Sequence, residues 1–347
     1  FSQPHKLFYT LCNANRIMKQ NIIDRLNRLA NEKEPFLFVI NYPGTEAYIE
    51  KLSAIAPSEC LYDFEGLTNV AKQPLPSSAQ RPTWKVKAPR IEDYTRSFDI
   101  VKSNILAGNS YLANLTCQVA VDCDLSFEEI FHRANSKYKL LLKRKESKAK
   151  QLVCFSPETF VRIKKDRIYS YPMKGTLDAS TPNAQEVLLS DKKEAAEHAT
   201  IVDLIRNDLS RVADNVRVDR YRYIDVLQTN KGEILQTSSE ISGRLPADYH
   251  TRIGDILEAQ LPAGSITGAP KKKTREIIHE AEGYDRGYYT GIMGIYEKGE
   301  LNSAVMIRIL EQNESGMFFK AGGGITSKSD CRKEYEEVLQ KIYLPIE

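Results

Sequence analysis

The sequence contains no apolar run that approaches the roughly 20 residues a bilayer-spanning helix needs, and it opens without a charged-then-apolar leader. Its 49 basic and 46 acidic residues leave a formal net charge of only +3, so no overall field indicates nucleic acid or an anionic membrane. The six cysteines show neither Cys-x-x-Cys spacing nor the density of a disulfide scaffold. These absences predict a cytoplasmic protein with no membrane or nucleic-acid partner.

At 347 residues the chain can bury a large core. Apolar periodicity predicts helices over 15–31, 94–105, 191–212, 270–283 and 330–343, and a capping box at Ser126 predicts a short helix that ends near Tyr138. Strands are expected over 37–40, 110–121 and around Val153, Val161 and Ile168, followed by an antiparallel meander over 289–296, 301–310 and 317–321. Because strands and helices do not alternate regularly, the predicted class is α+β, with a linker at 73–82.

Lys174 stands between Pro172 and Gly175 after a β-rich run. Pro172 cannot donate a hydrogen bond to a sheet, so the strand over 167–171 is expected to end there. Gly175 would then let the backbone turn sharply after the lysine. A lysine placed in this way is a candidate nucleophile, and the alternative is a solvated lysine in a turn.

Two predicted helices each carry a Glu-x-x-Glu pair, Glu194 with Glu197 and Glu334 with Glu337. Residues three apart share one helix face. If the pairs converge, carboxylates about 4 Å apart repel by roughly 4 kcal/mol at an effective dielectric of 20, so protons or a cation must lie between them. Oxygen-only ligands favour magnesium, whereas the alternative for each pair is solvated helix surface.

The glycines in 322–324 directly precede the last helix, so their N–H groups could form an anion-binding nest; the alternative is a flexible turn. Arg308 interrupts an apolar run and either lies at an edge or binds an anion, and its fork suits a carboxylate. A magnesium site, a nest, an arginine and a lysine together fit a small polycarboxylate substrate.

The chain resembles the chorismate-utilising enzymes, which include anthranilate synthase component I, aminodeoxychorismate synthase component I and the isochorismate and salicylate synthases. Eight motifs carry the resemblance in the family's order: AGNSYLANLT at 107–116, SPETF at 156–160, PMKGT at 172–176, EAAEHATIVDLIRNDLSRV at 194–212, LPAGSITGAPK at 261–271, RGYYTGIMG at 286–294, MIRI at 306–309 and AGGGITSKSDCRKEYEEVLQK at 321–341. It implies a chorismate-binding fold in α/β/β/α layers, with large antiparallel sheets flanked by helices. Residues 91–347 would form the catalytic domain, and a shortened segment 1–85 would add a helix and strands to the same body.

The resemblance also implies a reaction. The residue after Pro-Ile/Met tends to be alanine in anthranilate synthases and lysine in aminodeoxychorismate synthases, and here it is Lys174. Lys174 would add to C2 of chorismate and expel the C4 hydroxyl, with Glu158 as general acid, before ammonia enters at C4. A lysine is only about one part in a thousand neutral at pH 7, so burial or a nearby cation is expected to lower the Lys174 pKa.

The remaining site residues follow from the same resemblance. Glu197 and Glu337 would bind Mg²⁺ directly, with Glu194 and Glu334 supporting them through water, and Lys341 would balance the glutamates. Thr267 would join Lys174 and Glu158 as a catalytic residue that lines the ring site. The residues implied to bind the substrate are Gly175, Tyr289, Arg308, Gly322, Gly323, Gly324 and Lys341.

Two positions depart from the family pattern. Leu112 stands where the isochorismate synthases have a lysine, so water activation there is not expected. Gln236 replaces a common histidine and cannot shuttle a proton at neutral pH, so the product is expected to retain its pyruvyl group. With no fused glutaminase expected, a separate amidotransferase subunit would supply ammonia.

Three other functions compete with amination for the folate path. Anthranilate synthesis would leave Lys174 without a role, and Leu112 and Gln236 are compatible with a non-catalytic chorismate-binding homologue. The lysine-rich segment 139–150 is the sole feature that favours nucleic acid, and without aromatic residues between the lysines it is expected to be a solvated face.

Overall fold

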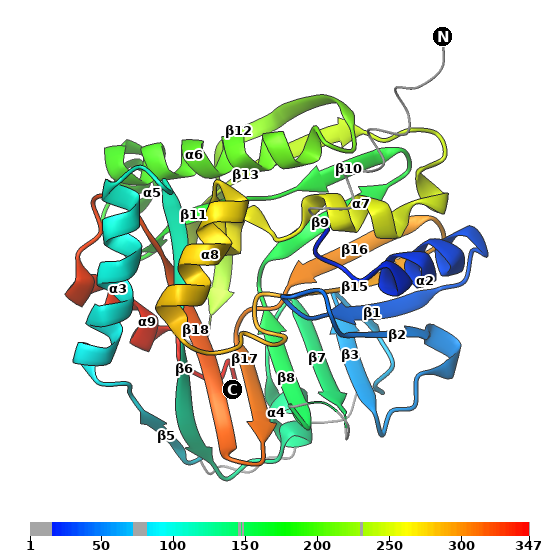
Figure 1. The fold of residues 1–347 in the computed structure, drawn as a ribbon, viewed down its shortest axis with the longest axis horizontal. Coiled ribbons are helices and arrows are strands. Elements are labelled where there is room, and N and C mark those ends of the chain that lie inside the picture. The colour runs from blue at the N-terminus through cyan, green and yellow to red at the C-terminus, as the bar shows by residue number, and fades with distance from the viewer. Residues whose placement is uncertain (1–15, 72–81, 145–146, 148, 230–231, 347) are drawn as a thin grey trace.

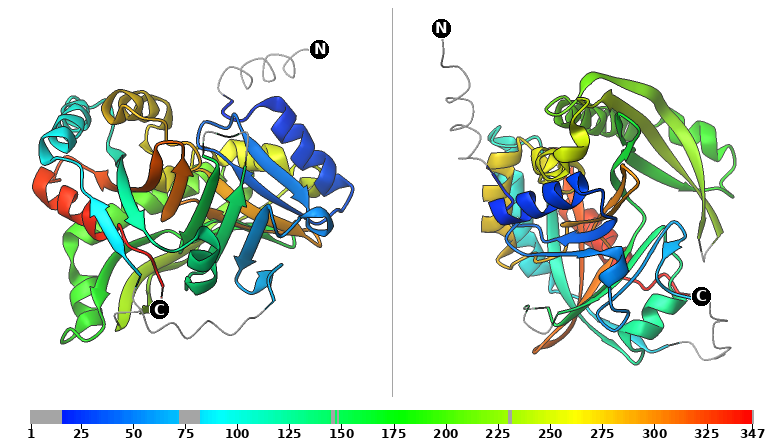
Figure 2. Two further views of the ribbon diagram at one scale, coloured as in Figure 1. Left: turned by 90° about the horizontal axis from the view of Figure 1, so that it is seen from below. Right: turned by 90° about the vertical axis from the view of Figure 1, so that its right-hand side faces the viewer.

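The computed structural model describes residues 16–71, 82–144, 147, 149–229 and 232–346. Within these ranges the strands form two nine-stranded antiparallel sheets, called A and B. Helices flank both sheets, as Figure 1 and the two turned views in Figure 2 show. The linker expected at 73–82 falls almost entirely outside the described residues.

The strands occur in an order unlike their order in the chain. Sheet A contains β11 (Met173–Asp178), β13 (Gly232–Arg244), β10 (Arg167–Ser170), β9 (Thr159–Lys164), β16 (Glu300–Val305), β15 (Ile292–Glu297), β1 (Phe36–Ile40) and β2 (Ala47–Lys51), with β12 (Asp214–Thr229) paired to β13. Sheet B contains β14 (Gly268–Ala269), β6 (Leu112–Cys123), β18 (Gly316–Ile325), β17 (Ile309–Asn313), β8 (Gln151–Ser156), β7 (Tyr138–Lys143), β3 (Cys60–Phe64) and β4 (Leu67–Thr68), with β5 (Trp84–Lys87) paired to β6.

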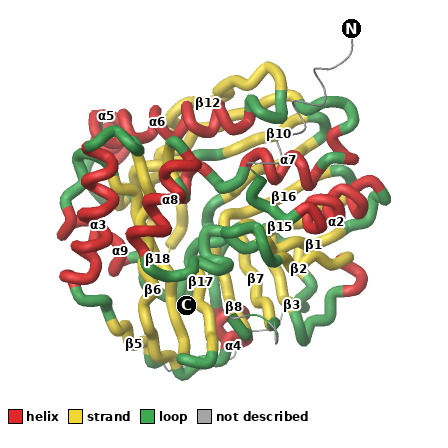
Figure 3. Tube along the Cα trace, viewed as in Figure 1, coloured by secondary structure: helices red, strands yellow, loops and turns green. Residues whose placement is uncertain are grey.

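The helices in the described part of the chain cover the outer faces of these sheets (Figure 3). They are α2 (Gln20–Asn31), α3 (Ile91–Leu106), α4 (Phe127–Arg133), α5 (Ala184–Ser190), α6 (Lys192–Leu209), α7 (Ile253–Gln260), α8 (Lys271–Glu282) and α9 (Cys331–Gln340), with 3₁₀ turns at Leu52–Ala54, Tyr249–Thr251 and Gly264–Ile266. None of the helices among these described residues is both long and apolar enough to cross a membrane.

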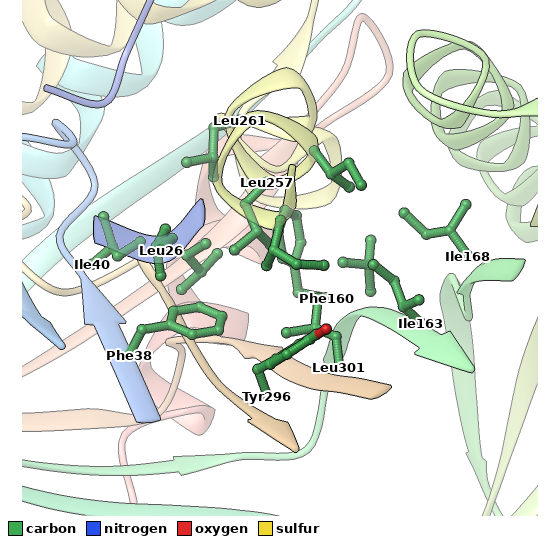
Figure 4. Packing of buried hydrophobic residues seen from close by; sticks show 14 of the residues in the cluster. Leu26, Phe38, Ile40, Phe160, Ile163, Ile168, Leu257, Leu261, Tyr296 and Leu301 are labelled. Carbon is green, nitrogen blue, oxygen red and sulfur yellow. The ribbon is translucent and has the colours of Figure 1, made fainter. Parts of the chain in front are cut away.

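Strand β1 shows how the layers pack. Successive side chains of a strand point to opposite faces, and all five residues of β1 are buried because both of its faces are covered. Phe36, Phe38 and Ile40 pack with α2 and α7 in the core that Figure 4 shows. Leu37 and Val39 point the other way, into a core shared with strands of sheet B. A third core lies between sheet B and helices α3, α4, α8 and α9.

Three cores separate four layers, in the order helices, sheet A, sheet B and helices. The predicted α+β class and the α/β/β/α layering with large antiparallel sheets are therefore confirmed. The N-terminal strands contribute to both sheets, since β1 pairs with β15 and β3 pairs with β7.

Some local expectations were wrong. The meander is two hairpins in different sheets, because β15–β16 belongs to sheet A whereas β17–β18 belongs to sheet B. The helix capped by Ser126 ends at Arg133, and Tyr138 begins β7. The segment after Tyr138 is in part that strand, with Leu140, Leu141 and Leu142 buried, so it is not simply a solvated face.

Candidate functional site

Lys174 lies inside β11 and not in a turn after a strand end. The pairing of β11 with β13 shifts register between Met173 and Thr176, and Gly175 in this interval has φ +81°. A bulge of this kind redirects a side chain, and glycine adopts the positive φ without a steric penalty. The Thr237 hydroxyl donates to the carbonyl oxygen of Lys174. The predicted turn is therefore wrong, and a bulge sets the direction of Lys174.

The Lys174 ammonium lies against a carboxylate of α6. Its Nζ is 2.9 Å from Glu197 Oε2, and 33% of the side chain is exposed. Burial acts to lower the pKa of Lys174, but the hydrogen bond with Glu197 and the charges of Glu197, Glu194 and Glu337 outweigh it, so the pKa lies above its usual value. The expected lowering is therefore not found in this state, and Lys174 is an ion-paired ammonium.

Helix α6 is held so that Glu194 and Glu197 face this lysine. Asp191 caps the helix by accepting hydrogen bonds from the backbone N–H groups of Lys193 and Glu194. His198 is 1% exposed, and its Nε2 lies 2.7 Å from Ser239 Oγ on β13. Because His198 anchors the helix to the sheet, the preceding residue Glu197 is directed toward Lys174.

The glycine run forms part of a strand. Gly322, Gly323 and Gly324 lie in β18 and pair with β6, and α9 begins only at Cys331, so the expected nest before the helix is wrong. A Cβ added to Gly323 would lie 3.6 Å from Glu334 Oε2 and 3.8 Å from Lys341 Nζ. The bare strand therefore leaves room beside the charged face of α9.

Lys341 joins the strand to this helix. Its Nζ donates to the carbonyl oxygen of Gly322 at 3.0 Å and lies 2.9 Å from Glu337 Oε1. Burial would raise the pKa of Glu337, but Lys341, together with the charges of Lys174 and Lys193, outweighs burial and lowers it. Lys341 thus balances a glutamate, as the sequence predicts.

The two glutamate pairs border one region. Charges of Glu194, Glu197 and Glu337 all act on Lys174, and burial raises the pKa of Glu194 and of Glu334. Carboxylate oxygens from two helices fit a hard cation such as Mg²⁺ in their chemistry. In the described ranges, however, no three acidic, histidine or cysteine side chains lie close enough together to hold a metal as they stand. The ammonium groups of Lys174 and Lys193 lie 2.9 and 3.7 Å from the carboxylate oxygens of Glu197.

Glu158 lies in an environment that disfavours its charged form. It lies between β8 and β9, and Ser265 Oγ donates to its Oε1 at 2.7 Å. Burial raises the pKa of Glu158, while this hydrogen bond and the charge of Lys341 only partly oppose the rise. A carboxyl group of this kind can donate a proton to a leaving hydroxyl.

Thr267 and Tyr289 are both buried and are supported by one arginine. Thr267 is fully buried, and its Oγ1 has no hydrogen-bond partner. Arg286 Nη1 donates to the carbonyl oxygen of Ile266 at 3.1 Å and to Thr290 Oγ1 at 3.2 Å, next to Thr267 and Tyr289. A buried hydroxyl without a partner points to a polar ligand group at that position.

Arg308 lies between β16 and β17 with φ +55°. Phe155 N donates to its carbonyl oxygen at 3.0 Å, which fixes the backbone. Its guanidinium lies 5.0 Å from the ring centre of Tyr343 and donates no hydrogen bond within the described residues. These donors remain available to a carboxylate.

Leu112 gives the site an apolar wall. Its Cδ1 would lie 3.2 Å from a Cβ added at Gly324, so an apolar side chain, and not a water-activating lysine, packs against the glycine strand here. Gln236 on β13 pairs with Thr176 on one side and Asp225 on the other.

Sequence reasoning missed three residues with clear roles here, namely Ser265, Arg286 and Tyr343. Ser265 and Arg286 lie within the quoted motifs, but periodicity does not reveal which buried acceptor a polar side chain will reach. No sequence signal indicated that Tyr343 contacts Arg308.

Comparisons with known proteins agree with this geometry. Residues 31–347 match the family described as chorismate binding enzyme. A Haemophilus influenzae protein named "uncharacterized PabA-like protein" is 46% identical over 330 residues, which cover 94% of this chain and 97% of that protein. Aminodeoxychorismate synthase component 1 of Klebsiella aerogenes is 31% identical over 271 residues, covering 75% of this chain and 58% of that enzyme.

A solved structure supports the same relationship. Anthranilate synthase component I from Streptococcus pneumoniae superposes with a TM-score of 0.64 and 26% sequence identity, over 76% of this chain and 59% of that one. The resemblance predicted from the motifs is thereby confirmed at the level of the family. On the match over residues 31–347, the chain belongs to the chorismate-binding enzymes.

Proposed function

We propose that this protein aminates chorismate at C4 to give 4-amino-4-deoxychorismate, as an aminodeoxychorismate synthase component I of the folate path. The observation that carries the proposal is the position of Lys174, whose Nζ lies 2.9 Å from Glu197 and within reach of charges from both glutamate pairs. This contact places an amine beside a carboxylate that can accept its proton.

The reaction uses Lys174 as a transient nucleophile. Its neutral amine forms a bond to C2 of chorismate, the ring double bonds shift, and the C4–oxygen bond breaks as Glu158 donates a proton to the departing hydroxyl. Ammonia then bonds to C4, the double bonds shift back, and the C2–nitrogen bond of Lys174 breaks. The proton that ammonia loses returns to Glu158, so the residues end as they began.

The proton on Lys174 must leave before attack. Glu197 Oε2 is within hydrogen-bond distance and can accept it, and Glu197 would release this proton to solvent before it binds the ion as a carboxylate. The donor set at the glutamates fits Mg²⁺ in chemistry, and Glu197 and Glu337 would hold the ion directly, with Glu194 and Glu334 supporting through water. When bound, magnesium supplies positive charge that stabilises the carboxylate substrate.

The remaining residues bind and orient the substrate. Arg308, with its uncommitted guanidinium, and Tyr289 would hold the pyruvyl carboxylate, and the unpartnered Thr267 hydroxyl would face the ring. Gly322, Gly323 and Gly324 let the substrate approach the strand, because they lack side chains. Ammonia would come from a separate glutamine amidotransferase subunit.

Mass spectrometry of the products tests the proposal. Purified protein is given chorismate, Mg²⁺ and ammonium salt, beside Lys174→Ala and Lys174→Arg variants. Aminodeoxychorismate is expected from the wild type and from neither variant, because arginine keeps the positive charge beside Glu197 but does not act as a nucleophile. Lys192→Ala changes an exposed lysine on α6, the helix that carries Glu197; it is the matched control and should retain activity.

The other outcomes identify the competing functions. Anthranilate as the product, with Lys174→Ala still active, would show that the protein is an anthranilate synthase component I. Chorismate binding without turnover, even with an amidotransferase added, would show a non-catalytic homologue.

A further inference from the structure

The segment after α9 places an aromatic ring over Arg308. We propose that Tyr343 is a positioning residue, which holds the Arg308 guanidinium in the orientation that receives a substrate carboxylate. The carboxylate is assigned to chorismate through the proposed function, and the inference rests on it to that extent.

Arg308 needs such a support because only its backbone is fixed. Phe155 N donates to its carbonyl oxygen at 3.0 Å, whereas no described residue accepts a hydrogen bond from its guanidinium. An arginine side chain loses rotamer freedom when it is ordered. The aromatic face of Tyr343, 5.0 Å from the guanidinium carbon, is the contact that limits this freedom.

The chain around Tyr343 is anchored on several sides. Ile342 and Leu344 are 5% and 8% exposed. Trp84 Nε1 donates to the carbonyl oxygen of Ile342 at 3.4 Å, and Asn135 N donates to that of Pro345 at 2.8 Å. Tyr343 itself is 38% exposed. The anchors therefore fix the position of a ring that contributes little to the core.

The same short segment connects two parts of the proposed site. Lys341, two residues before Tyr343, binds Glu337 and the carbonyl oxygen of Gly322. Ile309 pairs with Lys320, so Arg308 lies beside the strand that continues into the glycine run. Tyr343 thus fixes the position of the Arg308 guanidinium relative to the glycine strand and α9.

A stack of this kind is expected to affect binding more than chemistry. The Tyr343 ring is 38% exposed, so loss of its cation–π contact should raise KM about two- to fivefold. The kcat should remain within about twofold, since Tyr343 touches neither Lys174 nor Glu158 in the described contacts.

The experiment compares Tyr343→Leu and Tyr343→Phe in the ammonium-dependent reaction with chorismate. The leucine variant should show the rise in KM, and phenylalanine should restore the wild-type value because its ring still stacks. Tyr169→Leu removes a second arginine–tyrosine contact, that with Arg167 at 6.0 Å, and serves as the matched control with unchanged KM. A leucine variant with wild-type KM, or a phenylalanine variant that is equally impaired, would refute the inference.

A second measurement separates this inference from the proposed function. Phenylglyoxal modification of Arg308 is followed by peptide mass spectrometry, with pyruvate as the carboxylate probe. Pyruvate should protect Arg308 in the wild type and in Tyr343→Phe but several-fold less in Tyr343→Leu. If this pattern appears in a protein that does not aminate chorismate, the function fails and the role of Tyr343 stands; equal protection in all three proteins overturns the role of Tyr343.

Discussion

The substitution Arg286→Met should strongly destabilise the protein. Arg286 and Glu282 are both 2% exposed, and two of the arginine nitrogens contact the carboxylate, Nη2 at 2.6 Å and Nε at 2.8 Å. Arg286 also donates to the carbonyl oxygens of Ile266 and Asn114 and to Thr290. Breaking a buried pair leaves an uncompensated charge, so the expected loss of unfolding free energy is about 3–5 kcal/mol.

Urea unfolding followed by far-ultraviolet circular dichroism measures this loss. Arg332→Met is the matched control, because Arg332 and Glu336 have the same four-residue spacing but are 80% and 56% exposed, and its effect should stay below about 1 kcal/mol. In the double variant Arg286→Met with Glu282→Gln, part of the loss should be recovered since no buried charge remains. A loss below about 1 kcal/mol for Arg286→Met alone would refute this reasoning.

Three further predictions concern the site. A Cβ on Gly322 would lie 2.5 Å from Thr116 Cγ2, so Gly322→Ala should lower the unfolding free energy by about 1–3 kcal/mol. A Cβ on Gly323 meets nothing closer than 3.6 Å, so Gly323→Ala should fold normally and raise KM for chorismate. Equal urea midpoints for the two variants would contradict this prediction. Because the folded pKa of Glu158 is raised above 4.5, its contribution to stability is complete below that pH and is lost as pH rises through the folded pKa. Glu158→Gln should therefore gain stability relative to wild type between pH 4.5 and 7.5 in urea titrations while losing activity; a constant difference over that range would disprove the shift. Glu337→Gln should weaken Mg²⁺ binding at least about tenfold in calorimetry, and unchanged affinity would exclude Glu337 as a ligand.

Much of the fold could be predicted from periodicity, because buried faces leave a repeated pattern. The helix spacing of Tyr94, Phe98, Val101 and Ile105 is the buried face of α3, and the apolar run at Leu37 is a strand buried on both faces. Sheet assignment could not be predicted in this way. Three residues, 306–308, separate β16 from β17, and nothing in their sequence shows that the chain passes there from one sheet to the other.

The site could be located from its residue types, but its geometry could not. A glycine run before a helix is compatible with a nest or with a strand, and pairing with the distant strand β6 selects the strand. Pro172 and Gly175 correctly indicated irregular backbone near Lys174, but a bulge depends on register with β13, which lies about 60 residues further along the chain. The pKa of Lys174 is likewise raised by Glu197 and Glu194 on α6, and the sequence does not show that this helix packs beside the lysine.

The position of β1 has a consequence for synthesis of the chain. Its partner β15 begins at Ile292, more than 250 residues after Phe36. At translation rates of about 5–20 residues per second, β15 is made roughly 10–50 s after β1. During this interval a wholly apolar strand, Phe36–Ile40, emerges without the neighbour that covers one of its edges. The nascent chain is therefore expected to need chaperone protection at its beginning, long before the residues that bind substrate have been translated.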